Sequence, residues 1–597
     1  MLTTLTAPAF AKTWYIEEGD ITISAGKTEG TNKVTQGTTT DEEDTNTTIT
    51  NRDKDTPSSN TVTIKAENEN DKVEVKLEDV NIDASSRSEA AVSVTGKGDT
   101  TIELDGDNEL KSGAGHAGLE HNKTDTSGEL TIQDKDNNGS LEAAGGFKGA
   151  GIGSAGSNDA QVKITGGNIT ATSDDWGAGI GSGSYGTGTV EITGGEINAT
   201  GGYLGAGIGG GCNGSGNVTI SGGTITAAGG DGAAGIGGGY YNGATVTITG
   251  DAVIKNASTT VYGAGIGGGN GYDGDVTISG NAKIENATGG YGAAGIGGGA
   301  FSSPDKIGNG NVVIKDNAKI DNVQGGAYGA GIGGGIYGLS NVTIEGNTKV
   351  NATGGAGGAA IGGGAGAENN SDNNGNQITI KSNENGSPTI NAVGGGTDEG
   401  EKIVIGGAGI GAGCESDADA DITLEGKVTI TATAGKDNVA IGANGIEQEF
   451  SGLAEGSSIT RYDPEGNDTT LPTDPGYPVP AVPSSSGGGS ADASVQESVF
   501  PGLVVTDKDG QRISYTSIRG NNVLSLRVGR FTASLRASLA TLRQLRAEGI
   551  DTITFQTILC STTLSVDELL AMGGEDAEVV LTHHIRSSTL TVNGKAV

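Results

Sequence analysis

The sequence predicts a mainly β solenoid in which short strands stack in successive coils. Two observations carry this prediction. A Gly-Ala-Gly-Ile-Gly phrase, or a close variant, recurs between residues 149 and 442. Each copy is followed by a turn and by a segment with alternating β-branched residues, such as 217–220 (NVTI). A repeat of nearly constant length with no helical segment between its copies indicates a right-handed parallel β-helix.

One coil is predicted to contain three short strands. The regular copies are 28 to 30 residues apart, and a second alternating segment follows each first one, as in 196–199 (EINA). Period-two alternation is typical of half-buried strands. Longer spacings place extra residues in corner loops, around 301–310, 368–376 and 398–401. The isoleucine of the phrase recurs at Ile152, Ile180, Ile208, Ile236, Ile266, Ile296, Ile332, Ile361, Ile410 and Ile441.

The chain divides into four predicted segments. Residues 1–11 end in Ala-Phe-Ala, the small-x-small pattern of a signal-peptidase site, and are interpreted as a signal-peptide remnant. Residues 12–450 form the β-helix, with atypical N-terminal coils that cap the core. Within them, the Thr- and acid-rich stretch at about 30–59 is expected to be a long loop. Residues 451–494 form a Pro/Ser/Gly-rich linker, and residues 495–597 form a small α+β domain.

The last segment has its own pattern of elements. Strands are expected at 503–505, 523–526, 552–555 and 577–581, with a hairpin turn at 509–510. Apolar residues from Phe531 to Leu545 are spaced as in an amphipathic helix, and residues 565–568 (SVDE) form a capping box for a shorter one.

The phrases VTISGGTITA (218–227) and GAGIGGG (205–211) carry a resemblance. They resemble the glycine-rich repeats of large secreted surface proteins of Gram-positive bacteria. More distantly, the coil is similar to the right-handed β-helices of pectate-lyase-like and carbohydrate-binding or adhesin proteins. The resemblance covers roughly residues 60–450. It implies an exported scaffold that faces sugars or a host, and it transfers no catalytic site.

Charge and hydropathy exclude several classes of partner. The formal net charge is −37, which argues against binding to nucleic acid. No run of 18 apolar residues exists, so no membrane span is expected. Three cysteines, two in the β-helix and one in the last domain, give no disulfide framework. The protein is expected to be an extracellular monomer, either secreted or associated with the cell surface.

The sequence offers little support for catalysis. No arginine lies between Glu142 and Phe450, and no Gly-His-Gly occurs. The best carboxylate pair is Asp174 and Asp175 beside Trp176, but neighbouring residues on a strand point to opposite faces. Two solvated loop carboxylates are the favoured interpretation. No catalytic residue is therefore predicted.

Aromatic residues suggest a ligand-binding column. Each precedes a repeat isoleucine by four or five positions, so stacking brings the rings together along one edge, with an interruption at Asp231. Such a column either binds the apolar faces of sugar rings or only packs the corners. The predicted ligand-binding residues are Trp176, Tyr203, Tyr262, Tyr291 and Tyr328, and Phe147 extends the column.

Three further patterns each have two interpretations. Asp134, Asp136 and Asn138 match the first half of a calcium loop, although Gly145 stands where the bidentate Glu belongs, and a polar turn is the alternative. Calcium is the one cofactor suggested. The glycine phrase leaves a strip of bare backbone, either a shallow groove or a surface covered by the chain's own loops. An exposed threonine ladder at 219, 247, 277 and 343 is attributed to β-propensity rather than to ice binding.

These observations together predict an exported, non-catalytic cell-surface scaffold that binds carbohydrate or mediates adhesion. The expected partner is a polysaccharide or a host or cell-surface glycan. A polysaccharide lyase or glycoside hydrolase on the same fold is the alternative, and a purely structural surface protein is the second alternative.

Overall fold

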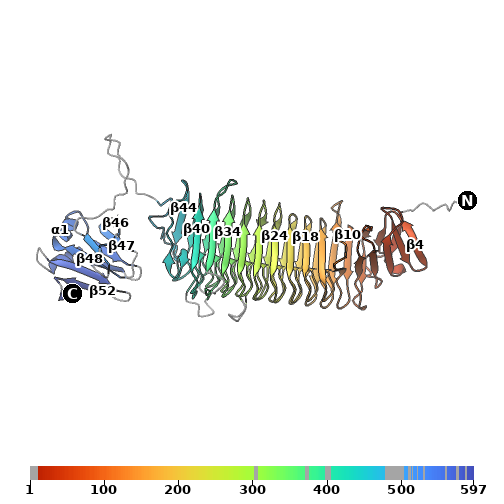
Figure 1. The fold of residues 1–597 in the computed structure, drawn as a ribbon. Coiled ribbons are helices and arrows are strands. Elements are labelled where there is room, and N and C mark those ends of the chain that lie inside the picture. Colours follow the sequence, from red (N-terminus) through yellow and green to blue (C-terminus); the bar gives the residue numbers. More distant parts are fainter. Residues whose placement is uncertain are drawn as a thin grey trace, which may run out of the picture. The chain divides into compact units, whose positions relative to one another are not determined.

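The computed structural model contains two compact units, Met1–Pro480 and Ala481–Val597 (Figure 1). It describes residues 11–300, 307–369, 375–396 and 405–477. Within 503–596 it describes all residues except 508–511, 514, 521, 529–531, 558–560, 573–576, 585–587 and 594. In the described residues, no helix is long and apolar enough to cross a membrane.

The first unit is a parallel β-helix, as predicted. Each regular coil contributes one strand to each of three faces, and each strand pairs in parallel with its counterpart in the next coil. The coils form a continuous stack, which Figure 1 shows from the side.

Face 1 carries the first strand of each coil. Its strands are β1 (Thr13–Tyr15), β5 (Thr48–Thr50), β7 (Lys72–Glu78), the first part of β10 (Asp99–Lys111), β12 (Leu130–Gln133), β15 (Asp159–Ile164), β18 (Gly188–Ile192), β21 (Gly216–Ile220), β24 (Ala244–Ile248), β27 (Gly274–Ile278), β31 (Gly310–Ile314), β34 (Ser340–Glu345), β37 (Asn376–Lys381) and β40 (Ala420–Glu425).

Face 2 carries the second strand. Its strands are β8 (Asn81–Asp83), the last part of β10, β13 (Gly139–Gly145), β16 (Asn168–Ser173), β19 (Glu196–Thr200), β22 (Thr224–Ala228), β25 (Val253–Ser258), β28 (Lys283–Ile284), β29 (Ala287–Thr288), β32 (Lys319–Gln324), β35 (Lys349–Thr353), β38 (Thr389–Val393), β41 (Thr429–Thr433) and β44 (Ser458–Tyr462).

Face 3 carries the glycine phrase. Its strands are β2 (Ile21–Ala25), β3 (Asn32–Gln36), β4 (Thr39–Asp44), β6 (Val62–Ala66), β9 (Val92–Gly96), β11 (Leu119–Lys123), β14 (Ile152–Gly153), β17 (Ile180–Gly181), β20 (Ile208–Gly209), β23 (Ile236–Gly237), β26 (Ile266–Gly267), β30 (Ile296–Gly297), β33 (Ile332–Gly333), β36 (Ile361–Gly362), β39 (Ile410–Gly411), β42 (Ile441–Ala443) and β43 (Ile446–Glu447).

The core consists of columns of like residues. The ten repeat isoleucines pair with one another from coil to coil and are buried. Val218 and Ile220 of β21 and Ile225 of β22 belong to equivalent buried columns. Burying a Val or Ile side chain contributes about 1.5–3 kcal/mol, so the stacked columns are the main source of stability.

The glycine phrase exists because neighbouring coils approach each other closely at face 3. Gly209 has φ +132°, and a Cβ placed there would lie 2.1 Å from the carbonyl oxygen of Gly237 in the next coil. The residues of the phrase at 205–211 are buried. Of the two interpretations of the bare backbone, the structure therefore supports covering by the chain's own coils.

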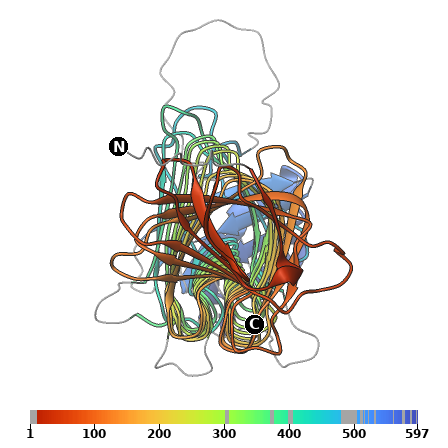
Figure 2. The ribbon, with the colours of Figure 1, turned by 90° about the vertical axis from the view of Figure 1, so that its right-hand side faces the viewer.

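The N-terminal cap differs from the prediction of a long loop at 30–59. Strand β3 pairs antiparallel with β2 and β4 pairs antiparallel with β3, so both extend face 3, and β5 belongs to face 1. Figure 2 looks at this end of the stack and shows the cap lying across the first coils. Trp14 donates a hydrogen bond from Nε1 to the buried Asp44, at 2.7 Å. Buried polar pairs of this kind hold together a segment with few apolar residues.

The C-terminal end of the stack extends beyond residue 450, where the sequence repeat ends. Strand β44 pairs in parallel with β41, so its backbone adds one more rung to face 2. Residues 463–477 of the predicted linker segment fold back on this rung, and the Ile459 backbone N–H donates a hydrogen bond to the Pro475 carbonyl oxygen at 3.0 Å. The predicted boundary at 450 missed this rung because it carries no glycine phrase.

The second unit is α+β. One sheet orders β45 (Leu503–Thr506), β48 (Ala533–Ser538), β51 (Glu578–His583), β52 (Ser588–Val592) and β53 (Lys595–Ala596) as antiparallel neighbours. The other orders β46 (Thr516–Gly520), β47 (Val523–Arg527), β49 (Thr552–Gln556) and β50 (Ser561–Ser565), with β47 and β49 parallel. The helices are α1 (Leu539–Ala547) and α2 (Val566–Ala571).

One helix of this unit was predicted too long. The helix expected from Phe531 to Leu545 begins only at Leu539, since Ala533, Leu535 and Ala537 are buried on alternate positions of β48. Their period-two burial competes with the helical spacing. Ser565 is the N-cap of α2, because its hydroxyl accepts a hydrogen bond from the Glu568 backbone N–H, which is one of the two bonds of the predicted capping box. The predicted turn at 509–510 lies outside the described residues.

Candidate functional site

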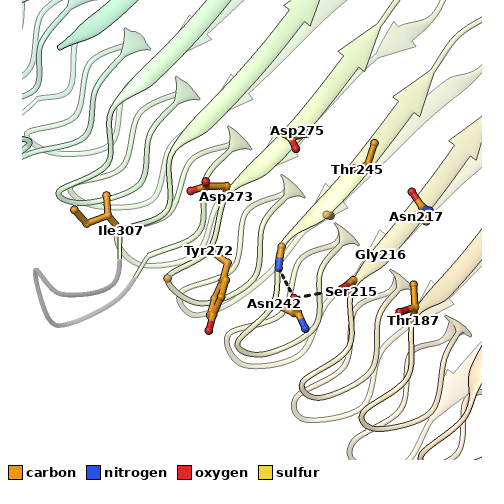
Figure 3. Close-up of a pocket in the computed structure, with 13 residues that line it drawn as sticks. Thr187, Ser215, Gly216, Asn217, Asn242, Thr245, Tyr272, Asp273, Asp275 and Ile307 are labelled. Atoms are coloured by element: carbon orange, nitrogen blue, oxygen red, sulfur yellow. Dashed lines mark hydrogen bonds between the residues drawn. The ribbon is translucent and has the colours of Figure 1, made fainter. Parts of the chain in front are cut away.

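A polar hollow of about 640 Å³ lies at the corner between face 3 and face 1. Figure 3 shows its side chains, which come from successive coils. It is lined by Thr187, Ser215, Gly216, Asn217, Asn242, Gly243, Ala244, Thr245, Gly271, Tyr272, Asp273, Asp275 and Ile307.

A column of stacked residues lines the hollow, and one member of this column is a glycine. The residue just before each face 1 strand is Thr187, Ser215, Gly243 and Asp273 in successive coils. Glycine at position 243 leaves space between the Ser215 hydroxyl and the Asp273 carboxylate. The floor beside it consists of Gly216 and Ala244, which are also small.

A hydrogen-bonded loop fixes one wall. The Asn242 side-chain oxygen accepts hydrogen bonds from the Ser215 hydroxyl at 3.3 Å and from the Gly243 amide at 3.1 Å. Its amide nitrogen donates to the Asn213 carbonyl at 3.2 Å. Asn242 therefore links two coils and holds the corner in one geometry.

Two carboxylates stand at the other end. Asp273 accepts a hydrogen bond from the Asn309 amide at 2.7 Å, and Asp275 accepts one from the Asn311 side chain at 2.7 Å. Desolvation by the walls raises the pKa of Asp273 above its ordinary value, and the negative charge of Asp275 adds to this rise. Asp273 still keeps an exposed surface, so its carboxyl group is accessible to a ligand.

The hollow continues along the stack. A second, smaller depression of about 220 Å³ shares Thr245 and Asp275 with the first. It reaches Asn311 and then Asn341 and Thr343, two coils further on. We call the two depressions together the axial groove.

The predicted aromatic residues do not form one continuous column. Tyr262, Tyr291 and Tyr328 form a cluster, with ring centroids 6.2 and 5.6 Å apart and edge-to-face contacts. Trp176 instead pairs with Phe147 at 5.4 Å. Perpendicular neighbours pack well against one another but present no continuous flat platform.

Tyr203 lies apart from both clusters in the ring contacts of the described residues, and its side chain is 59% exposed. Lys148 lies over the rings of Phe147 and Trp176, at 5.3 and 4.9 Å from their centroids. The pair of Phe147 and Trp176 is thus a cation–π site as well as an aromatic contact.

The predicted calcium loop is closed by its own hydrogen bonds. Both carboxylate oxygens of Asp134 accept backbone N–H groups, from Asn138 at 3.2 Å and Gly139 at 3.0 Å. The Asn138 side chain donates to Asp105, and Asp136 is exposed. This geometry is that of a polar turn. The described residues contain no group of three or more His, Cys, Asp or Glu side chains arranged to hold a metal ion.

The axial groove was missed from the sequence. Its walls come from the seventh position after a repeat isoleucine and from the first outward position of face 1. An alignment of the repeats would have shown glycine at position 243 where neighbouring coils have Ser215 and Asp273. Asp174 and Asp175, the best carboxylate pair in the sequence and interpreted there as two solvated loop carboxylates, do not line the groove.

Comparisons with known proteins agree with the coil architecture. A family model described as beta helix repeat matches residues 162–184, 190–212, 218–240 and 276–300. Neither the curated proteins nor the solved structures gave a match. The matched segments begin in strands of face 1 and run towards the next glycine phrase, as one coil does. Repeat match and stacked strands together identify the chain as a parallel β-helix protein.

Proposed function

We propose that this protein is an exported, non-catalytic β-helical scaffold that binds carbohydrate through the axial groove. One observation carries the proposal: the groove is open, polar and lined by side chains whose hydrogen-bonding groups are available. Asn217 and Thr245 are exposed, and their side chains form no hydrogen bond with the described residues of the protein.

The residue types suit a sugar. An amide offers both donors and an acceptor, and a hydroxyl offers one donor and two acceptor lone pairs, which matches the mixed character of sugar hydroxyl groups. Tyr272 adds an aromatic ring at the rim, suited to the apolar face of a pyranose. A concave site with a few placed polar groups is the usual form of a small-molecule site.

Export and surface association rest on the sequence. They follow from the Ala-Phe-Ala pattern at residues 9–11 and from the resemblance to secreted surface proteins. A high net negative charge is compatible with a soluble extracellular scaffold. Adhesion is the same proposal with a cell-surface glycan as the ligand.

A glycan array on the full-length purified protein tests the proposal. The groove variant combines Asn217→Ala with Thr245→Ala. Its matched control combines Asn198→Ala with Thr226→Ala, on face 2 of the same part of the stack. Binding that is lost in the groove variant and kept in the control supports the proposal. A protein that binds no glycan on the array contradicts it.

The cluster of Tyr262, Tyr291 and Tyr328 is the alternative glycan-binding site in the same protein. A variant with Tyr262→Ala, Tyr291→Ala and Tyr328→Ala removes the three edge-to-face rings. The groove proposal expects this variant to keep its glycan affinity while losing some stability. Loss of binding in this variant alone would assign the site to the aromatic residues.

Hydrolysis of a polysaccharide is the second candidate, and the carboxylate pair favours it. A carboxyl with a raised pKa near a second carboxylate is the arrangement of a general acid and its partner. Asp273 and Asp275 stand in this way where the two depressions of the groove meet. Release of reducing ends from a bound glycan, abolished by Asp273→Asn, would establish an enzyme. Binding without release in the wild type supports the non-catalytic scaffold.

A further inference from the structure

The structure assigns a ligand class and an orientation to the axial groove. We propose that the groove binds an extended, neutral, linear polysaccharide lying parallel to the stack, with about one sugar residue per coil. This inference rests on the proposed carbohydrate function and adds the shape, charge and direction of the ligand.

Equivalent outward side chains recur along the groove, one from each coil. The first outward position of face 1 is occupied in successive coils by residues that pair in strict register, so their spacing is that of neighbouring strands, about 4.8 Å. Four of these six positions are exposed amides or hydroxyls. The column consists of Thr189, Asn217, Thr245, Asp275, Asn311 and Asn341.

A second polar column runs beside the first. It lies two residues further along each strand and is therefore on the same outward face. In register it is occupied by Glu191, Thr219, Thr247, Thr277, Val313 and Thr343. Each coil therefore offers a pair of outward side chains, and both members of the pair are polar except in the coil of Val313.

The two depressions give this repetition a continuous path. They share Thr245 and Asp275, and together they extend from Thr187 to Asn341. A single sugar or a compact branched glycan would occupy one or two coils and leave the rest unused. A linear chain parallel to the stack contacts all of them.

The geometry of the sugar chain favours some linear polysaccharides over others. Pyranose residues joined by equatorial β-1,4 bonds form a flat ribbon, and each sugar residue advances by nearly the spacing of adjacent coils. The hydroxyl groups of such a ribbon project from its edges, towards the amide and hydroxyl columns. Chains that coil into wide helices, such as α-1,4-glucans, lose this register after a few residues.

Electrostatics selects a neutral chain. The lining of the groove contains Asp273 and Asp275 and no Lys or Arg among the described residues. The formal net charge of the protein is −37. Polymers of uronic acids or sulfated sugars would therefore be repelled, and their carboxylate or sulfate groups would find no cation in the groove.

Oligosaccharides of graded length test the inference by isothermal titration calorimetry on the full-length protein. The probes are neutral cello-oligosaccharides and N-acetylated chito-oligosaccharides, from disaccharide to octasaccharide, and oligogalacturonates and α-1,4-linked gluco-oligosaccharides of the same lengths are the comparison series. For at least one series we expect affinity to rise severalfold with each added residue and to level off near the hexasaccharide, since the two depressions extend over the six coils from Thr187 to Asn341.

A variant at the Asn341 end of the groove tests the predicted length of the binding site. Asn341→Ala should move the plateau to a shorter oligosaccharide and leave disaccharide affinity unchanged. Asn391→Ala, an exposed asparagine on face 2, is the matched control and should change neither.

Each contrary outcome is distinguishable. Affinity that does not depend on length would overturn the linear arrangement and keep the proposed function. Preference for oligogalacturonates or for α-1,4-linked glucans would overturn the assigned class. Failure of every glycan to bind would overturn the inference and the proposed function together.

Discussion

Arg461 and Asp474 form a bidentate ion pair that is buried at the C-terminal end of the stack. Arg461 donates from Nε and Nη2 to the two carboxylate oxygens of Asp474, at 2.7 and 2.9 Å. Arg461 is fully buried and also contacts Glu447 and the carbonyl of Gln448. The pair closes the rung of β44, which is the last one in the described part of the first unit.

Breaking this pair should release the end of the stack. Asp474→Ala leaves a buried guanidinium without its main partner, and the expected cost is about 3–5 kcal/mol. Amide hydrogen exchange should become faster in β42 and β44. Glu74→Gln removes an exposed pair with Lys135 and should cost less than about 1 kcal/mol. Unchanged exchange in the Asp474 variant would show that the pair does not hold the cap.

A glycine of face 3 should tolerate no side chain. Gly209→Ala introduces a Cβ that meets the next coil and a backbone conformation that L-residues rarely adopt. Strain and overpacking predict a loss of about 2–6 kcal/mol in the free energy of unfolding. Denaturant unfolding followed by tryptophan fluorescence measures it, since both tryptophans of the chain lie in the stack. Gly396→Ala, where a Cβ has open space, should stay within about 0.5 kcal/mol of the wild type.

The buried His121 should make the N-terminal coils sensitive to acid. Burial lowers the pKa of His121 below its ordinary value of 6.5, and its ring nitrogen Nδ1 lies 3.1 Å from the Gln161 carbonyl oxygen. The unfolded state therefore binds a proton more readily than the folded state does. The stability of the wild type should fall as the pH decreases below about 6.5.

His121→Gln removes this proton linkage. Thermal unfolding of the wild type and the variant should be compared at several pH values, so that contributions from other groups cancel in the difference. The wild type should lose more stability than the variant on acidification. A difference that does not vary with pH would contradict the assignment.

The two thiols of the stack should be inert in the folded protein. Burial raises the pKa of both Cys212 and Cys414 to about 11, and each side chain is 4% exposed. At pH 8 roughly one thiol in a thousand is then ionised. In a Cys560→Ser background, a thiol reagent should modify the native protein very slowly and the denatured protein at once. Rapid labelling of the native protein would indicate that the corners open.

Much of the fold could be predicted from the sequence, because coil periodicity is a local signal repeated many times. Val218 and Ile220 alternate with polar residues, and Ile208 and Ile236 lie one coil apart. The cap at 30–59 could not be predicted in the same way. Its strands contain few apolar residues and are held by polar contacts such as that between Trp14 and Asp44, which lie 30 residues apart.

The candidate site was harder to predict for a related reason. The lining of the axial groove includes Gly243, which has no side chain. The groove also depends on how Asn217, Thr245 and Asn341 align across coils. A search for catalytic motifs or aromatic residues within one coil passes over such a surface. Sequence inspection did find the aromatic positions, but not the edge-to-face packing of Tyr262 against Tyr291.

The β-helix has a cap at each end and structurally equivalent coils between the caps, so the number of coils can change. The antiparallel strands β3 and β4 finish one end, and Arg461 fastens the other. Between them, Gly209 and Gly237 occupy equivalent places in successive rungs. A gene can therefore gain or lose one whole coil and still encode both terminal closures. Each such event would lengthen or shorten the molecule by a fixed step, so its reach can change during evolution while its architecture stays the same.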